Sequence, residues 1–86
     1  MTRWHITLSG RVQGVGLRFR TKMAAQQYGL TGWARNLDSG DVELELQGEQ
    51  YKVDACLEHI RSLPGVRVEF LCAEEIPPIP EKHFRI

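Results

Sequence analysis

The first 37 residues of the chain contain no aspartate and no glutamate, and all 11 acids lie from Asp38 onward. The same segment carries six bases, which are Arg3, Arg11, Arg18, Arg20, Lys22 and Arg35. The remainder has five bases against its 11 acids, so the two segments carry net charges of +6 and −6. A segment without carboxylates is typical of a site that receives an anion. Ion pairs between the two segments are the alternative explanation, and we expect some of them.

Long apolar runs and signal-like segments are also missing. No apolar stretch approaches the roughly 18 residues of a membrane-spanning helix. The first residues, "MTRWHITLSG", alternate between polar and apolar side chains, which is not typical of a secretion signal. A chain of 86 residues has the length of one small domain. We therefore expect a single domain over residues 1–86, located in the cytoplasm and not bound to a membrane.

Residues that commonly bind metals are few and scattered. The two cysteines, Cys56 and Cys72, match neither a metal-binding spacing nor a CxxC motif. We expect both thiols to be buried, because each falls on the apolar side of a predicted helix or strand. The histidines, His5, His59 and His83, share no ligand spacing. These patterns predict a protein with no metal site and no other cofactor.

The periods of apolar residues predict the order β-α-β-β-α-β. Alternation predicts strands over residues 3–10, 30–36, 42–48 and 66–72, and helical spacing predicts helices over 18–28 and 50–63. The prolines of "IPPIP" indicate a stiff connector, and "HFRI" indicates a short closing strand or edge. Each strand has one polar face, so the helices are expected to cover only the other face. Right-handed crossovers then give an α+β sandwich with a four-stranded antiparallel sheet and two helices on one face.

The stretch "GRVQGVGLR", residues 10–18, joins the first strand to the first helix and contains three glycines. It lacks the Gly-Lys-Ser/Thr ending of a Walker loop. Phe19 takes the place of the third glycine in a dinucleotide-binding fingerprint. Val12 stands where a thiol phosphatase would carry its cysteine. No side chain of this stretch can therefore form a covalent phosphoenzyme.

The backbone of the same stretch is suited to an anion. Gly14 and Gly16 can adopt positive φ without strain, and alternating signs of φ turn successive N–H groups inward. The N-terminus of the following helix adds unpaired N–H groups, and Arg18 adds a planar guanidinium that matches two phosphate oxygens. A glycine-rich turn that only reverses the chain is the alternative interpretation.

Two segments resemble the signature segments of the acylphosphatase family. They are "LSGRVQGVGLR", with a Gly-x-Val-Gln-Gly-Val core, and "GWARNLDSGDVELELQG", with a Gly-Trp-x-x-Asn run. The similarity extends from Ile6 to the closing "HFRI", and Leu17 and Leu37 depart from residues that are usual in the family. The resemblance implies a ferredoxin-like α/β sandwich that hydrolyses acyl phosphates to a carboxylate and inorganic phosphate without a metal.

The resemblance also implies which residues act. Arg18 and the backbone N–H groups of the loop bind the phosphoryl group, and Asn36 positions the attacking water. The loop residues are Gln13, Gly14, Val15, Gly16, Leu17 and Arg18. Strand alternation places Ala34 and Asn36 on the face that the helices cover, although the residues alone leave open that Asn36 is an ordinary turn residue. No general base is expected nearby, so the phosphate itself would accept the proton of the water.

Two alternatives belong to other functional classes. A sheet with Arg18, Arg20, Lys22 and Arg35 could bind RNA, but Trp33 is the only aromatic side chain suited to stack on a base. A non-catalytic, anion-binding or regulatory acylphosphatase-like module is the second alternative. We expect the enzyme: a monomer whose partner is a small-molecule acyl phosphate and which binds no nucleic acid.

Overall fold

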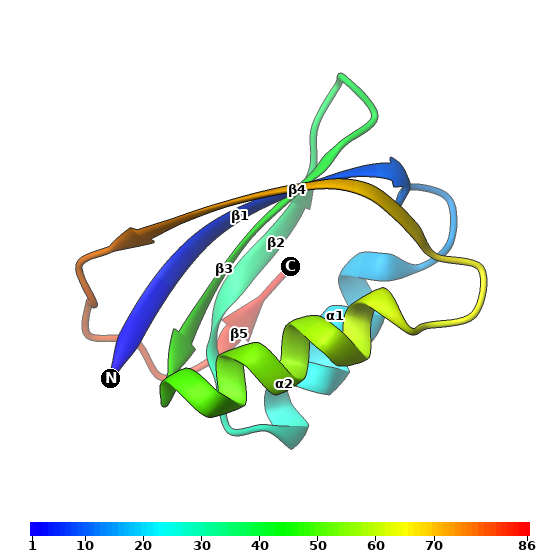
Figure 1. The fold of residues 1–86 in the computed structure, drawn as a ribbon. Helices are drawn as coiled ribbons and strands as arrows, with labels where there is room; N and C mark the ends of the chain where they lie inside the picture. Colours follow the sequence, from blue (N-terminus) through cyan, green and yellow to red (C-terminus); the bar gives the residue numbers. More distant parts are fainter.

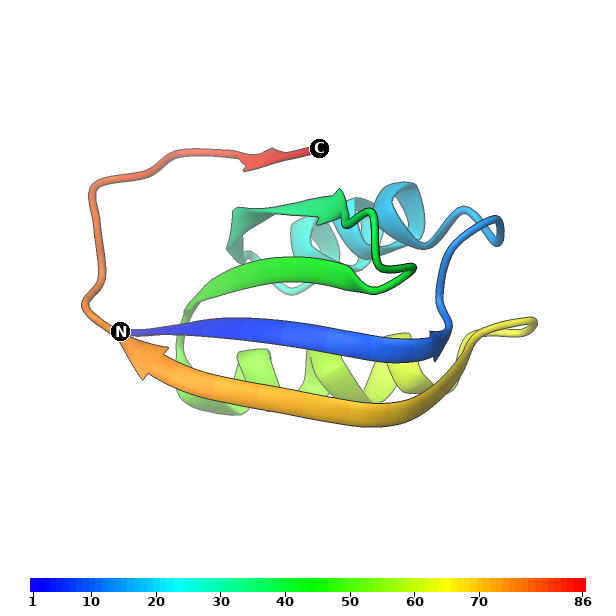
Figure 2. The same cartoon turned by 90° about the horizontal axis from the view of Figure 1, so that it is seen from above.

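A computed structural model describes residues 1–86 and contains one sheet with two helices on one of its faces (Figure 1, Figure 2). The elements are β1 (Thr2–Arg11), α1 (Leu17–Gln27), β2 (Thr31–Asn36), β3 (Val42–Gly48), α2 (Gln50–Arg61), β4 (Arg67–Ile76) and β5 (Phe84–Arg85). The strands lie in the order β4-β1-β3-β2-β5. Neither α1 nor α2 has the length and apolar content of a membrane-spanning helix.

The ferredoxin-like βαββαβ arrangement is confirmed, but the sheet has five strands and is not wholly antiparallel. The additional strand, β5, pairs in parallel with β2 through Gly32↔Phe84 and Trp33↔Arg85. Among β1–β4, β2 pairs only with β3, which leaves one edge of β2 with unpaired N–H and C=O groups. The C-terminal segment covers that edge, and the buried side chain of Phe84 anchors it.

The hydrophobic core lies between the sheet and the two helices. The strands contribute Ile6, Leu8, Ala34, Val42, Leu44 and Leu46, and the helices contribute Leu17, Ala24, Ala25, Val53, Cys56 and Ile60. Alternation along β1, β2 and β3 predicts this set of strand residues correctly. The packing holds α1 against β2, so the first turn of α1 and the last residue of β2 lie near each other.

A β-bulge interrupts the pairing of β1 with β4. Ser9 pairs with Phe70 and Gly10 pairs with Val68, so Glu69 is an extra residue on β4. Gly10 permits this close approach, because a Cβ atom there would lie only 2.3 Å from the carbonyl oxygen of Arg67. A single extra residue reverses the facing of every side chain beyond it.

The bulge explains why the predicted burial of Cys72 is wrong. Beyond it, Phe70 and Cys72 point away from the helices and are exposed, while Leu71 turns toward the core. The prediction of a buried thiol is therefore confirmed for Cys56 and wrong for Cys72.

A buried ion pair fastens the C-terminal segment to the face of the sheet that has no helices. Arg3 Nη1 lies 2.7 Å from Glu81 Oε1, and Arg3 Nε lies 2.7 Å from Glu45 Oε1. The side chains of Arg3 and Glu81 are only 1% and 7% exposed. Gln47 adds two hydrogen bonds to the backbone of Ile79, at 2.7 and 2.9 Å. These contacts position the C-terminal segment so that β5 pairs with β2.

We expect Glu81→Gln to lower the free energy of unfolding at pH 7 by about 3 kcal/mol, as is typical when a buried ion pair is broken. Burial raises the pKa of Glu81, but the hydrogen bond and charge of Arg3 outweigh it and hold the pKa below its usual value. Such a carboxylate adds stability above its unfolded-state pKa, and this stability is lost as the pH falls through the folded-state pKa. Denaturant unfolding is therefore expected to show the full difference at pH 7 and a shrinking one below about pH 4.3.

Glu75→Gln is the matched control, because Glu75 is exposed on β4 and forms no ion pair. Equal stability of Glu81→Gln and the wild type at pH 7 would show that the buried pair does not stabilise the fold.

Candidate active site

The loop between β1 and α1 has an alternating backbone conformation. Gly14 has a φ of +74° and Gly16 has a φ of +70°. Only glycines have positive φ in this chain, so Val15 and Leu17 have negative φ. Alternating signs turn successive N–H groups to one side and form a concave site for an anion. The prediction of positive φ at Gly14 and Gly16 is confirmed.

The N–H groups of residues 14–19 donate no hydrogen bond within the protein. The first hydrogen bond of α1 runs from the N–H of Arg20 to the carbonyl of Gly16, at 3.0 Å. No acidic residue lies in the first turn of α1. Unpaired N–H groups and the positive end of the helix dipole both favour an anion at this end of α1.

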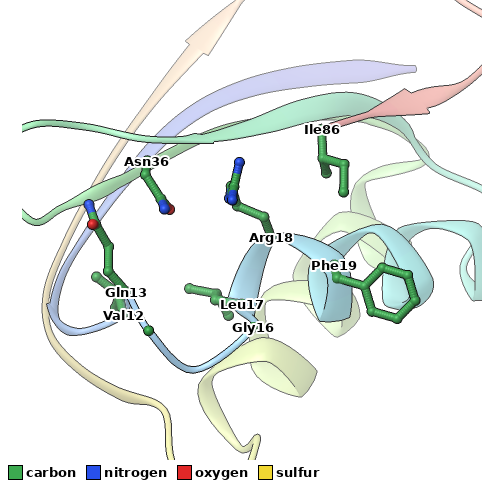
Figure 3. A pocket seen from close by; sticks show the side chains of 9 residues that line it. Val12, Gln13, Gly16, Leu17, Arg18, Phe19, Asn36 and Ile86 are labelled. Carbon is green, nitrogen blue, oxygen red and sulfur yellow. The ribbon is translucent and has the colours of Figure 1, made fainter.

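These donors border a cavity of about 320 Å³ (Figure 3). Its lining residues are Val12, Gln13, Gly14, Gly16, Leu17, Arg18, Phe19, Asn36 and Ile86. In Figure 3, the side chain of Arg18 extends from α1 toward β2, and that of Asn36 extends from β2 toward α1. The structure therefore brings six of the seven predicted site residues to one cavity. The exception is Val15, whose side chain packs against the core and does not line the cavity.

Asn36 is the last residue of β2, and its facing follows from the strand alternation. Ala34, two residues earlier, is buried under the helices opposite Leu44. Trp33 and Arg35 lie on the other face, where the guanidinium of Arg35 contacts the carboxylate of Glu43. The prediction that Asn36 shares a face with α1 is confirmed.

The bases of the acid-free segment divide into those with a partner and those without one. Arg3 and Arg35 pair with carboxylates, and Arg20 donates to the carbonyl oxygens of Pro64 and Val15. The other three bases of the acid-free segment, Arg11, Arg18 and Lys22, form no ion pair. The ion-pair explanation of the charge asymmetry is therefore confirmed in part, and Arg18 is the only ionisable side chain that lines the cavity.

The side chain of Gln13 forms two hydrogen bonds that were not predicted from the sequence. Its Nε2 donates to the carbonyl oxygens of Leu37, at 2.7 Å, and of Asp41, at 2.8 Å. Both acceptors belong to the β2–β3 turn that follows Asn36. The amide of Gln13 is therefore engaged with this turn, and only its backbone is left to face an anion.

Three lining residues, Val12, Phe19 and Ile86, were not predicted as site residues. Val12 is buried beneath the cavity, whereas Phe19 and Ile86 are mainly exposed beside it. Val12 and Phe19 flank the predicted loop, so their position along the chain could have suggested them. Ile86 reaches the cavity only because β5 pairs with β2, and no local sequence pattern indicates that pairing.

Chemically, the site offers hydrogen-bond donors, one guanidinium and one carboxamide. The lining contains no histidine, cysteine or carboxylate side chain, so it has no donor set typical of a tightly held metal ion. Burial raises the pKa of Cys56 to about 12, so that thiol is not a thiolate at neutral pH. The site can hold an anion and polarise it, but it has no nucleophile of its own.

Known proteins are similar to this chain in both sequence and fold. Residues 4–86 match the family described as Acylphosphatase. An acylphosphatase of Marinobacter nauticus is 40% identical over 82 residues, which cover 94% of this chain and 89% of the relative. One from Yersinia pseudotuberculosis is 44% identical, covering 90% and 86%. The crystal structure of acylphosphatase from Bacillus subtilis superposes with a TM-score of 0.93 at 31% identity, covering 100% of this chain and 98% of that one.

The family match spans nearly the whole chain, and the relatives are covered over most of their length. The chain therefore belongs to the acylphosphatase family and is an enzyme that hydrolyses acyl phosphates.

Proposed function

We propose that Arg18 and the loop N–H groups bind the phosphoryl group of an acyl phosphate and that Asn36 positions the attacking water. The water oxygen forms a bond to phosphorus as the bond from phosphorus to the acyl oxygen breaks. The electron pair of the broken bond stays on the acyl oxygen, so the acyl group leaves as a carboxylate. The other product is inorganic phosphate. The observation that carries the proposal is that free N–H groups, Arg18 and Asn36 meet at one cavity.

Two features support the binding role of the loop and Arg18. A guanidinium presents parallel N–H donors to two phosphate oxygens, and that of Arg18 is not engaged by any carboxylate. The N–H groups of residues 14–19 supply further donors at the same cavity. Phosphoryl transfer depends mainly on positioning and on stabilisation of charge at the equatorial oxygens, which these groups can provide.

The chemistry of Asn36 supports a role in orienting the water but not in accepting its proton. Its amide oxygen can accept a hydrogen bond from water, but a carboxamide is not a base. No histidine or carboxylate side chain lines the cavity, and His5 is on the open face of the sheet, 2.7 Å from Glu43. We therefore propose that a phosphoryl oxygen of the substrate accepts the proton. A carboxylate is a good leaving group, so the reaction does not need an acid on the protein.

We also propose that the reaction needs no metal, cofactor, nucleic acid or second copy of the chain. The positive charge for the phosphoryl oxygens comes from Arg18 and the start of α1, and one chain supplies the whole lining. We propose the cytoplasm as the location, because its reducing conditions keep an exposed thiol such as Cys72 free.

Turnover tests this proposal. We expect the protein to release phosphate from benzoyl phosphate and acetyl phosphate, with inorganic phosphate as a competitive inhibitor and with equal rates in buffer and in EDTA. Phosphate binding without turnover would support the non-catalytic module instead. Loss of activity in EDTA, restored by a divalent cation, would contradict the metal-independent mechanism.

Thiol chemistry gives a separate prediction. Under native conditions we expect an alkylating reagent to modify Cys72 alone, because Cys56 is fully buried and its pKa is raised to about 12. Mass spectrometry should show a single adduct, and activity should be unchanged, since neither thiol lines the cavity. Loss of activity in a singly labelled protein with an unchanged circular dichroism spectrum would assign Cys72 a part in the site.

The alternating backbone conformation of the loop between β1 and α1 is tested by a pair of glycine substitutions. Gly16 and Gly29 have φ of +70° and +69°, and a Cβ atom at either position meets no close neighbour. Alanine at either site therefore incurs a similar conformational cost of about 1–2 kcal/mol. We expect Gly16→Ala to weaken phosphate inhibition by roughly 5- to 30-fold as the loop relaxes, and Gly29→Ala to leave it unchanged. Equal inhibition constants in both variants would mean that the loop conformation does not matter for binding.

A further inference from the structure

We propose that Gln13 is a positioning residue, which holds Asn36 in register with the phosphate-binding loop. This role rests on the proposed function of Asn36. Gln13 immediately precedes Gly14, and its Nε2 donates to Leu37, the residue immediately after Asn36, at 2.7 Å. One side chain therefore links the two halves of the site within one residue of each.

The second hydrogen bond makes this link specific. Nε2 of Gln13 also donates to the carbonyl oxygen of Asp41, at 2.8 Å. That oxygen accepts the N–H of Leu37 as well, at 2.9 Å. Gln13 thus bridges both ends of the β2–β3 turn, and two carbonyl acceptors require an NH₂ group facing them. A methionine or leucine of similar size fills the space but donates nothing.

No other hydrogen bond joins this turn to the loop. Asp38, Ser39 and Gly40 are exposed, and the remaining hydrogen bonds of the turn are internal to it, as from Gly40 N–H to Leu37 at 3.1 Å. Asn36 itself is exposed and makes no side-chain hydrogen bond. Without Gln13, the end of β2 can therefore shift relative to the donors of residues 14–19. A displacement near 1 Å costs up to about 10²-fold in rate.

The test is a double-mutant cycle of Gln13→Met and Asn36→Ala, read as kcat and as the inhibition constant of inorganic phosphate. We expect Gln13→Met to lower kcat about tenfold, with little change in phosphate inhibition, because the loop donors remain. In the Asn36→Ala background, the same substitution is expected to leave kcat unchanged, since the group that it positions is gone.

Three results would overturn the role: an unchanged kcat in Gln13→Met, an equal fall of kcat in both backgrounds, or a loss of phosphate affinity as large as the loss of kcat. The proposed function fails differently, through an unchanged kcat in Asn36→Ala alone. Gln50→Met is the matched control, because that amide bonds Thr2 and Trp4 at the other end of the sheet. Thermal melts verify folding, and Gln13→Leu replaces the methionine variant if that chain does not fold.

Discussion

Replacement of Arg18 by alanine is expected to lower kcat/KM for an acyl phosphate by at least about 10²–10³-fold while the fold stays intact. Loss of one preorganised donor to developing charge typically has this effect. Arg18 supplies the only charged side chain in the cavity, so no neighbour can compensate for it. The side chain is exposed in the first turn of α1 and belongs to no part of the core, so stability is expected to change little.

Two further variants show whether geometry or charge matters. Arg18→Lys keeps the charge but loses the planar pair of donors, so we expect it to recover little activity. Arg11→Ala removes another unpaired, exposed base that does not line the cavity, and it serves as the control for net charge. Near-normal activity of Arg18→Lys would refute a bidentate contact with the phosphoryl group.

Asn36→Ala is expected to lower kcat by about 10²-fold and to change the inhibition constant of phosphate little. Its proposed contact is with the water, and an interaction made only in the transition state affects kcat without affecting ground-state binding. Steady-state kinetics with phosphate as inhibitor measure both quantities.

Ser39→Ala is the control for Asn36, because Ser39 lies in the turn that follows Asn36 and its hydroxyl accepts one hydrogen bond, from the N–H of Asp41 at 3.3 Å. A fall in phosphate affinity as large as the fall in kcat would instead place Asn36 among the phosphate-binding groups.

Local patterns were sufficient to predict most of the fold and the centre of the site. Alternation gave the correct facing of β1, β2 and β3, because one face of each is buried under the helices. The spacing of Gly14 and Gly16 predicted the alternating backbone conformation of the loop, since positive φ at both is nearly exclusive to glycine. Asn36 could be placed on the same face as α1 by counting along β2.

What could not be predicted depends on contacts between distant segments. The bulge at Glu69 reverses the facing of Cys72, and it arises from the register of β1 against β4. The closing strand at "HFRI" was predicted, but its pairing with β2, which brings Ile86 to the cavity, was not, because this pairing and the ion pair of Arg3 with Glu81 join segments far apart in the sequence. The hydrogen bonds of Gln13 likewise join residues that only the folded chain brings together.

Hydrolysis in ¹⁸O-labelled water tests most directly whether the cavity delivers water to phosphorus. We expect mass spectrometry to find the label from enzymatic turnover in inorganic phosphate and none in the carboxylate, because Asn36 and the loop both act on the phosphoryl group. A parallel incubation without enzyme gives the background. Label in the carboxylate would mean that water attacks the carbonyl carbon, and it would contradict the roles assigned to Arg18 and Asn36.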